Sequence, residues 1–346
     1  EAISDMDLAG MVAFYNRRIA SATDDRQRGQ AQRLRDKARA SLARVLGAYG
    51  IRVYAGTGFV STPMVSLGVV KLKADLGIVI TASHNPPSYN GFKLKAAYDG
   101  PMIPSDIAEV EKLIPDVCSL KELPSLNQLV EKKLFQDTDL ETMYLRHAKK
   151  HFDLRSIKQS AGRLAYDAMY GAGQRAVRKL LPKSVFLRCD VNPGMHGQAP
   201  EPIHRNLLAL SETIKKNPKI TAGLANDGDA DRIGMYDEDG NFVDSHHLLL
   251  ILLLYLYKYK NMRGKVVFTF SVTDKMKKMA EQFGLPYEIT KVGFKYIAEI
   301  MTKEDVLVGG EESGGLAVKG HIPERDGVWM GLLVFEFMAR TGKTMK

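Results

Sequence analysis

Short apolar runs of strand length alternate with helical patterns along most of the chain, and this alternation limits the fold more than any other feature. The runs are rich in Val, Ile, Leu, Ala and Phe and lie at 51–55, 76–81, 163–167, 184–189, 221–225, 265–270 and 305–309. Strands separated by helices usually lie parallel in one sheet. An antiparallel hairpin is also expected, because Asp239-Gly240 separates apolar segments at 233–236 and 242–243. The sequence therefore predicts an α/β fold with mixed, largely parallel sheets.

The chain is too long for one hydrophobic core, since it has 346 residues and domains usually have about 100–150. A polar stretch at 136–139 precedes a charged helix, and an apolar helix at 246–259 ends in a polar segment. No low-complexity linker separates these parts, so we expect them to pack tightly around a central cleft. The predicted units are 1–138, 139–259 and 260–346.

One arrangement recurs in each predicted unit: an apolar strand runs directly into a polar loop that contains glycine or proline. The loops lie in 77–87, 221–232 and 306–315. Ligands of open α/β sheets bind beyond the carboxyl ends of the strands. We therefore expect these loops to line a shared site.

Three aspartates, Asp227, Asp229 and Asp231, alternate with small residues in the second loop. In an extended segment alternate side chains project to one side, where three carboxylates repel one another. A cation is the expected remedy, and oxygen ligands alone favour Mg²⁺, Mn²⁺ or Ca²⁺ over zinc. Two alternatives stay open: a solvated acidic loop, and an EF-hand that ends at Glu238. The EF-hand is disfavoured because Arg232 stands where that loop needs glycine.

Ser83 follows an apolar strand and precedes His84, Asn85 and two prolines. A nucleophile-elbow hydrolase requires Gly-x-Ser-x-Gly, which the residues flanking Ser83 do not supply. Considered alone, the segment also fits a serine in a turn with Asn85.

The formal net charge is +9, with a dense basic segment between Arg26 and Arg44. This segment has helical apolar spacing and no aromatic residue to stack on a base, so a solvated helix is favoured over a nucleic-acid surface. The longest apolar run, 248–254, is too short to cross a membrane. Two cysteines are too few for a disulfide framework, and the first residues given have neither a basic segment nor an apolar run typical of a secretion signal. We therefore expect a cytoplasmic protein.

Taken together, the loops resemble those of the α-D-phosphohexomutase superfamily. The resemblance rests on Thr81-Ala-Ser-His-Asn-Pro with Asn90-Gly-Phe-Lys93, on Asp227-Gly-Asp-Ala-Asp-Arg232 and on Gly310-Glu-Glu-Ser-Gly-Gly315. Weaker matches are Val292-Gly-Phe-Lys295 and Arg325-Asp-Gly327. The loops look most like those of the phosphoglucomutase and phosphomannomutase branch.

The resemblance implies a role for each loop. Ser83 would carry a phosphoryl group, and Asp227, Asp229 and Asp231 would hold Mg²⁺, which also touches the phosphate on Ser83. Cationic residues, Lys93 and Arg232, would hold the phosphoserine and neutralise the transition state. The sugar would be bound by Glu311, Ser313 and Arg325.

The proton acceptor is less clear from the sequence. Lys93 and Lys295 are candidates for the general base if neighbouring cations lower their pKa. The alternative for both lysines is that they only neutralise the charge of a phosphate. His84 either orients its loop or transfers a proton.

The implied activity is the interconversion of hexose 1-phosphate and hexose 6-phosphate, on glucose or mannose, through phosphoserine and a bisphosphate intermediate. Hexose 1,6-bisphosphate would activate the protein, and its partners would be small phosphosugars. The superfamily's fourth, phosphate-clamping domain has no counterpart up to Lys346, so weak transfer to free hexose phosphates is expected. A non-catalytic phosphosugar- or metal-binding relative is the alternative. The sequence leaves the hexose preference and the oligomeric state open.

Overall fold

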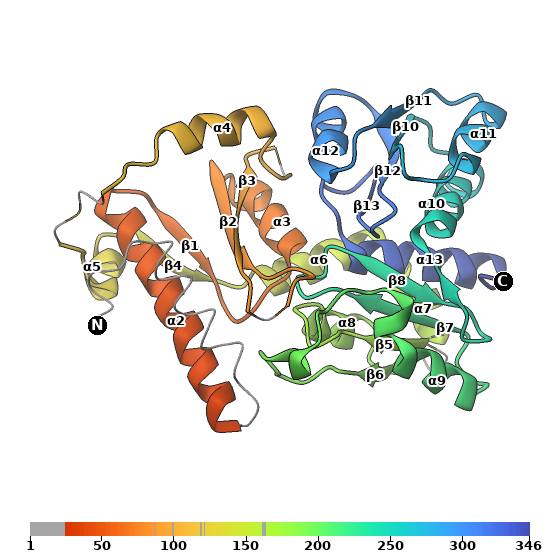
Figure 1. The fold of residues 1–346 in the computed structure, drawn as a ribbon, viewed down its shortest axis with the longest axis horizontal. Helices are drawn as coiled ribbons and strands as arrows, with labels where there is room; N and C mark the ends of the chain where they lie inside the picture. The colour runs from red at the N-terminus through yellow and green to blue at the C-terminus, as the bar shows by residue number, and fades with distance from the viewer. Residues whose placement is uncertain (1–24, 87, 99, 118–119, 121, 161–163) are drawn as a thin grey trace.

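The computed structural model describes residues 25–86, 88–98, 100–117, 120, 122–160 and 164–346. Figure 1 shows three α/β units in chain order, coloured from red and orange through green to blue. The predicted fold class of consecutive α/β units with mixed sheets is confirmed.

The first unit is built on two separate two-stranded sheets. Strand β1 (Val53–Gly56) pairs in parallel with β4 (Phe135–Thr138), and β2 (Leu76–Thr81) pairs antiparallel with β3 (Gly91–Ala96). Its helices are α2 (Asp25–Ala48), α3 (Thr62–Leu72), α4 (Pro104–Lys112) and α5 (Leu126–Glu131). Helix α3 begins where Ser61 accepts a hydrogen bond from Met64 N and Pro63 fixes the first turn.

The second unit contains a five-stranded sheet in the order β6-β5-β7-β8-β9. The predicted hairpin joins the last two strands, with Gly240 at φ 72° in the turn. The strands are β5 (Leu164–Asp167), β6 (Val185–Leu187), β7 (Ala222–Asn226), β8 (Ile233–Tyr236) and β9 (Phe242–Val243). The helices are α6 (Leu140–His151), α7 (Leu154–Ser160), α8 (Gln174–Leu180) and α9 (Leu208–Lys216), with 3₁₀ turns η3 (Met195–Gly197) and η4 (His204–Asn206).

The third unit contains a four-stranded sheet in the order β11-β10-β12-β13. Its strands are β10 (Lys265–Thr269), β11 (Tyr287–Thr290), β12 (Val306–Gly310) and β13 (Leu316–Val318). Helix α10 (Ser245–Leu254) continues as a π-helical turn η5 (Tyr255–Tyr259), and the remaining helices are α11 (Lys275–Gln282), α12 (Phe294–Lys303) and α13 (Gly327–Thr341).

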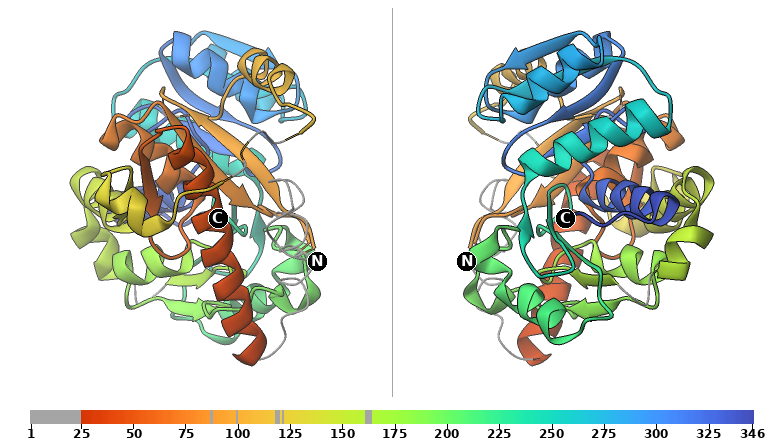
Figure 2. Two further views of the ribbon diagram at one scale, coloured as in Figure 1. Left: turned by 90° about the vertical axis from the view of Figure 1, so that its left-hand side faces the viewer. Right: turned by 90° about the vertical axis from the view of Figure 1, so that its right-hand side faces the viewer.

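One apolar core joins the second and third units. Helix α10 packs on β12 and α11, so it belongs to the third sheet rather than to the second unit, where the boundary at 259 had placed it. Helix α13 contacts α7, β7 and β8 of the second unit as well as β13, and Figures 1 and 2 show it alongside α10 and between the two sheets. The second and third units follow each other in the chain, but they share one core because α13 packs on both sheets.

Four strands, β3, β4, β11 and β13, were not singled out by the sequence. Strand β3 alternates Lys93 and Lys95 with apolar residues, and the other three have no more than four residues each. Short or charged strands carry little periodicity, and sheet neighbours decide their conformation.

In the C-terminal half of the basic helix α2, two arginines bind neighbouring segments and are not simply solvated. Arg44 donates from Nε to Pro124 O at 2.7 Å and from Nη2 to Leu123 O at 3.1 Å, and Arg39 donates to Ala55 O at 3.1 Å. Arg39 also pairs with Asp137. These arginines attach α2 to its own unit. Among the described helices, none is both long and apolar enough to span a membrane.

Candidate active site

Loops from all three units meet beside the carboxyl end of β7. The loop after β2 brings Ser83, the loop after β7 brings the three aspartates, and the segment before α13 brings Arg325. Strand ends at sheet edges are the usual places for such side chains.

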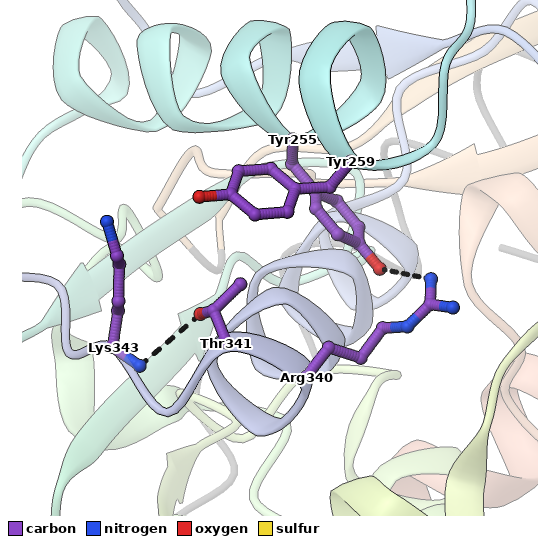
Figure 3. A pocket seen from close by; sticks show the side chains of 5 residues that line it. All are labelled: Tyr255, Tyr259, Arg340, Thr341 and Lys343. Atoms are coloured by element: carbon purple, nitrogen blue, oxygen red, sulfur yellow. Dashed lines mark hydrogen bonds between the residues drawn. The ribbon is translucent and has the colours of Figure 1, made fainter.

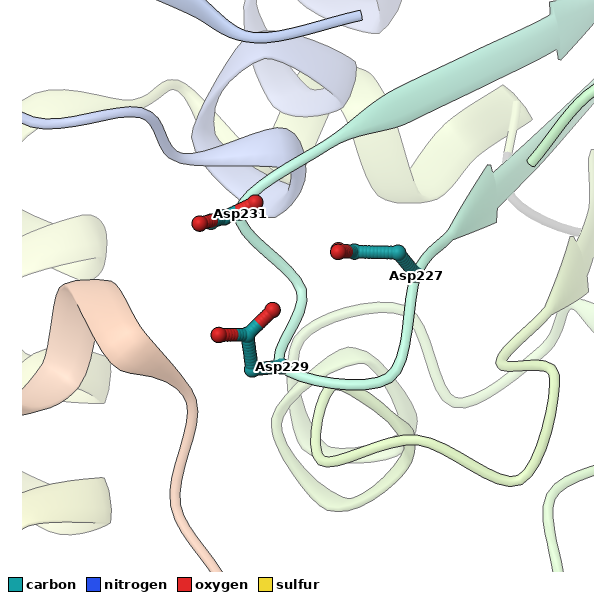
Figure 4. A group of neighbouring side chains, drawn as sticks. All are labelled: Asp227, Asp229 and Asp231. Atoms are coloured by element: carbon teal, nitrogen blue, oxygen red, sulfur yellow. The ribbon is translucent and has the colours of Figure 1, made fainter. Parts of the chain in front are cut away.

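The three aspartates form a buried cluster, shown in Figure 4. Asp227 and Asp231 are fully buried and Asp229 is 3% exposed, and their ligand oxygens lie within 4.8 Å of one another. The solvated-loop alternative is therefore wrong. The EF-hand alternative is wrong too, because the strands β7 and β8 flank the loop instead of helices.

The positive charges around the cluster do not compensate all three carboxylates. Burial, and then repulsion by Asp231 and Asp229, raises the pKa of Asp227 well above its usual range. Burial also opposes ionisation of Asp229, but Lys93 and a hydrogen bond from Thr62 lower the pKa of that carboxyl. Asp229 Oδ1 and Asp231 Oδ1 are buried and have no hydrogen-bond partner in the described part of the chain.

These observations fit a hard divalent cation. Buried carboxylate oxygens without donors are expensive, and a cation that takes oxygen ligands satisfies several at once. Asp227, Asp229 and Asp231 are the residues suited to hold Mg²⁺.

Ser83 is buried and faces the cluster. Its backbone has φ 53°, its N–H donates to Thr81 Oγ1 at 2.8 Å, and its Oγ donates to Asp227 Oδ2 at 3.2 Å. A left-handed conformation at serine is strained and has to be held by its surroundings. The expected turn with Asn85 exists, since Asn85 Nδ2 donates to Ala82 O at 3.1 Å, and it directs Ser83 inward.

Glycine is required where the two loops touch. A Cβ on Gly228 would lie 2.4 Å from Ser83 O, which is closer than any real contact. The predicted extended conformation of this loop is wrong: residues 228–229 form a turn, Ala230 has φ 56°, and Ala230 N donates to Asp227 O at 3.1 Å. The turn, rather than strand register, brings the three carboxylates together, and the small residues are needed for close packing.

His84 and Arg232 lie at the edge of the cluster. His84 Nδ1 is 3.4 Å from Ser83 Oγ, and burial followed by the charge of Arg232 lowers the pKa of this histidine. Arg232 donates its backbone N–H to Asp227 Oδ1 at 3.0 Å, and its half-buried side chain has Nε without a partner among the described residues. The Nε of Arg232, which has no partner among the described residues, suits an anion on Ser83.

Lys93 and Lys295 have different surroundings. Lys93 Nζ donates to Asp229 Oδ2 at 2.9 Å and lies 3.4 Å from Asp231 Oδ2. Burial alone would lower the pKa of Lys93, but Asp231 and Asp229 outweigh it and raise the pKa above its usual value. A lysine that acts as a general base needs a lowered pKa, so the surroundings of Lys93 do not meet the condition set in the sequence analysis. Lys295 is exposed, with Nζ 5.3 Å from the ring centre of Tyr296.

The loop at 310–315, which is predicted to bind the sugar, lies beside the aspartate cluster. Glu311 is buried, its Oε1 accepts from Gly293 N at 2.8 Å, and burial raises its pKa against the opposing charge of Arg325. Arg325 donates from Nη2 to Asp231 Oδ2 at 2.6 Å and lies 3.8 Å from Glu311. Ser313 is half-buried two residues further on. Arg325 therefore bridges the metal cluster and this loop.

Sequence reasoning missed three residues that support the site. Thr62 Oγ1 donates to Asp229 Oδ2 at 2.6 Å, and Lys95 pairs with Glu324 next to Arg325. The sequence signal that could have found Thr62 and Lys95 is their position in the chain. Thr62 is the first residue of a helix capped by Ser61, and Lys95 lies on the same strand face as Lys93.

A surface hollow of about 380 Å³, shown in Figure 3, is lined by Tyr255, Tyr259, Arg340, Thr341 and Lys343. It contains none of the residues expected to bind substrate, so the candidate site is defined by the converging loops.

Comparisons with known proteins agree with this geometry. The chain matches the phosphoglucomutase/phosphomannomutase α/β/α domains I, II and III at 16–119, 142–240 and 244–346. The structure is similar to that of a putative phosphomannomutase from Thermus thermophilus, with a TM-score of 0.82, 33% identity, and 98% of this chain and 77% of that chain covered.

Curated relatives come from more than one branch. A phosphoglucosamine mutase of Rhizobium etli is 30% identical over 83% of this chain and 64% of its own length. A phosphoglucomutase/phosphomannomutase of Thermococcus kodakarensis is 30% identical over 83% of this chain and 62% of its own length. The chain thus spans less than two thirds of these relatives, and on domain order, loop motifs and fold together it belongs to the phosphoglucomutase/phosphomannomutase family.

Proposed function

We propose that this protein interconverts hexose 1-phosphates and hexose 6-phosphates, using Ser83 as the phosphoryl carrier. The observation that carries the proposal is the contact of Ser83 Oγ with Asp227 Oδ2 at 3.2 Å, inside a buried triad of carboxylates. A serine hydroxyl beside three carboxylates is a poor hydrolytic nucleophile but a suitable place for a phosphate that shares a cation with them.

The reaction consists of two phosphoryl transfers. The phosphoryl group passes from Ser83 Oγ to a free hydroxyl of the hexose phosphate, the proton of that hydroxyl ends on Ser83 Oγ, and a bisphosphate forms. After the bisphosphate reorients, its other phosphoryl group passes to Ser83 Oγ, and the serine proton ends on the sugar oxygen that is released. Mg²⁺ held by Asp227, Asp229 and Asp231 would neutralise charge on the transferring group.

The chain's own residues have distinct parts in this scheme. Lys93 and Arg232 bind phosphoryl oxygens, and His84 orients the Ser83 loop. The Glu311 carboxylate accepts hydrogen bonds from sugar hydroxyls, and the Ser313 hydroxyl can donate or accept them. Arg325 holds Glu311 and Asp231 in position relative to each other. The raised pKa of Lys93 favours charge neutralisation over proton transfer by this residue. Lys295 stays a candidate for proton transfer or phosphate binding.

The substrates we propose are glucose and mannose phosphates, with hexose 1,6-bisphosphate as activator. Relatives named for phosphoglucosamine make amino sugars the competing substrates. A protein of similar fold, N-acetylphosphoglucosamine mutase of Aspergillus fumigatus (TM-score 0.53, 17% identity), was solved with GlcNAc-6P and magnesium.

Phosphate mapping tests the proposal directly. After incubation with glucose 1,6-bisphosphate and Mg²⁺, intact mass should rise by one phosphate, and peptide mapping should locate it on Ser83. Ser83→Ala should abolish the change, whereas Ser88→Ala in the same loop should not. Phosphate on another residue would refute the mechanism.

Turnover separates the enzyme from the second candidate, a phosphosugar- or metal-binding relative. The panel is glucose, mannose and glucosamine 1-phosphates with Mg²⁺ and the matching bisphosphate. Formation of 6-phosphates supports the enzyme and ranks the sugars. A phosphorylated Ser83 with bound metal and no product from any sugar supports the binding protein.

A further inference from the structure

A buried ion pair joins the first unit to the segment that carries Arg325. Lys95 of β3 is paired with Glu324, and the two side chains are only 2% and 1% exposed. Ser66 of α3 donates to the same carboxylate oxygen, Glu324 Oε2, at 2.9 Å. The pair is therefore closed off from solvent.

Such a pair is costly to bury. Removing two charges from water is repaid only in part by their attraction, and apolar residues of similar volume are often as stable or more so. Lys95 and Glu324 are thus poorly explained by stability alone. What they provide is a defined position for the segments that they join.

The ion pair fixes the position of Arg325. Glu324 Oε1 accepts the backbone N–H of Arg325 at 3.1 Å, and Arg325 then donates to Asp231 at 2.6 Å. Lys95 and Lys93 are two residues apart and lie on one face of β3. The same strand face therefore reaches the aspartates directly through Lys93 and indirectly through Glu324 and Arg325.

We propose that Lys95 is a positioning residue for the metal and phosphoryl-transfer site, acting through its buried pair with Glu324 to hold Arg325 against Asp231. The inference rests on the proposed function for its catalytic consequence. Its effect on cation binding is independent of turnover.

The decisive variant replaces both partners, Lys95→Met with Glu324→Met. It leaves no unpaired buried charge, so the chain is expected to fold. The melting temperature should fall moderately, because Ser66 Oγ and the Arg325 N–H lose their acceptor. It removes the acceptor that holds Arg325. Mn²⁺ affinity, measured by calorimetry, should fall about tenfold, as for other residues that orient metal ligands. Phosphorylation of Ser83 by glucose 1,6-bisphosphate should slow by a similar factor.

A matched control uses another ion pair far from the cluster. Lys260 and Glu336 are 2.7 Å apart and 22% and 4% exposed, and Lys260→Met with Glu336→Met should leave Mn²⁺ affinity unchanged. Arg325→Met adds a coupling test. It should weaken Mn²⁺ binding in the wild type and in the control background, and have little further effect in the Lys95/Glu324 variant.

The outcomes distinguish the two proposals. Wild-type Mn²⁺ affinity in the Lys95/Glu324 variant, or an equal loss from Arg325→Met in both backgrounds, would overturn the positioning role. If wild-type protein binds Mn²⁺ but never becomes phosphorylated, the proposed function fails, and the Mn²⁺ measurements still decide the role of Lys95.

Discussion

The first unit and the other two are held in place by different kinds of contact. The largest apolar core runs through the second and third units, including α10 and α13, and its fully buried members from the first unit are Met64 and Leu67. The first unit docks on this core through α3, which packs on α6, and it reaches the aspartate loop through polar side chains, Thr62, Lys93 and Lys95. The unit that contains Ser83 thus combines a small apolar contact with the core and polar contacts at the candidate site.

The largest effect is expected where the two regions meet. Asp229→Ala removes a ligand and the acceptor of both Lys93 and Thr62, so Mn²⁺ affinity should fall by about two orders of magnitude or more. The melting temperature should change little, because lost repulsion within the triad offsets the lost contacts. Asp239→Ala, in the exposed hairpin, is the control for titration calorimetry. Unchanged Mn²⁺ binding in Asp229→Ala would show that the cation site is misassigned.

A core substitution should disturb the apolar core as a whole. Leu252 in α10 is fully buried, so Leu252→Ala should lower the free energy of unfolding by about 2–5 kcal/mol. Leu113 in the first unit is 81% exposed, and Leu113→Ala should cost no more than about 0.5 kcal/mol. Urea denaturation of both variants measures this difference. Equal losses would show that burial does not set the cost of truncation at these two positions.

A smaller effect is expected from the polar contacts themselves. Thr62→Val keeps the shape of the side chain and removes its hydrogen bond to Asp229, so Mn²⁺ affinity should fall about tenfold. The matched control is Thr302→Val on the exposed side of α12. An identical response of the two variants would mean that Thr62 does not orient the carboxylate.

The smallest effect concerns pH and the junction of α6 with α13. Burial, then His321 and His151, lowers the pKa of His147 from 6.5 to about 4. The unfolded chain therefore binds a proton before the folded one does, and stability present above pH 6.5 is lost as the pH falls towards 4. His147→Gln should flatten this decline in melting temperature. A decline of unchanged slope would show that other groups cause it.

The sequence predicted those parts of the fold and site that local pattern determines. The strand at 76–81, the strand predicted at 265–270 and found at 265–269, and the hairpin at Gly240 depend on periodicity and turn residues, and they agree with the structure. Asp227, Asp229 and Asp231 do cluster, but through a turn at 228–230 and not through the extended segment that their spacing predicted. Ser83 was expected to face these aspartates on the strength of the family resemblance.

The rest depends on contacts between residues far apart in the chain. No spacing rule relates Lys95 to Glu324 or Thr62 to Asp229, because each pair forms only when the units dock. The contacts of α10 with β12 and α11 are of the same kind. An apolar helix indicates that it is buried, but not which sheet covers it.

The placement of α13 has a consequence for making fragments of this protein. In sequence, α13 belongs to the family's domain III at 244–346, yet it packs on the sheet of domain II at 142–240. The approach is close: a Cβ on Gly331 would lie 2.6 Å from a methyl carbon of Leu224. A fragment cut at residue 240 would expose that sheet face to water, and one that began at 244 would expose the face of α13 that packs on α7, β7 and β8. The smallest piece expected to fold autonomously is therefore the two domains expressed together.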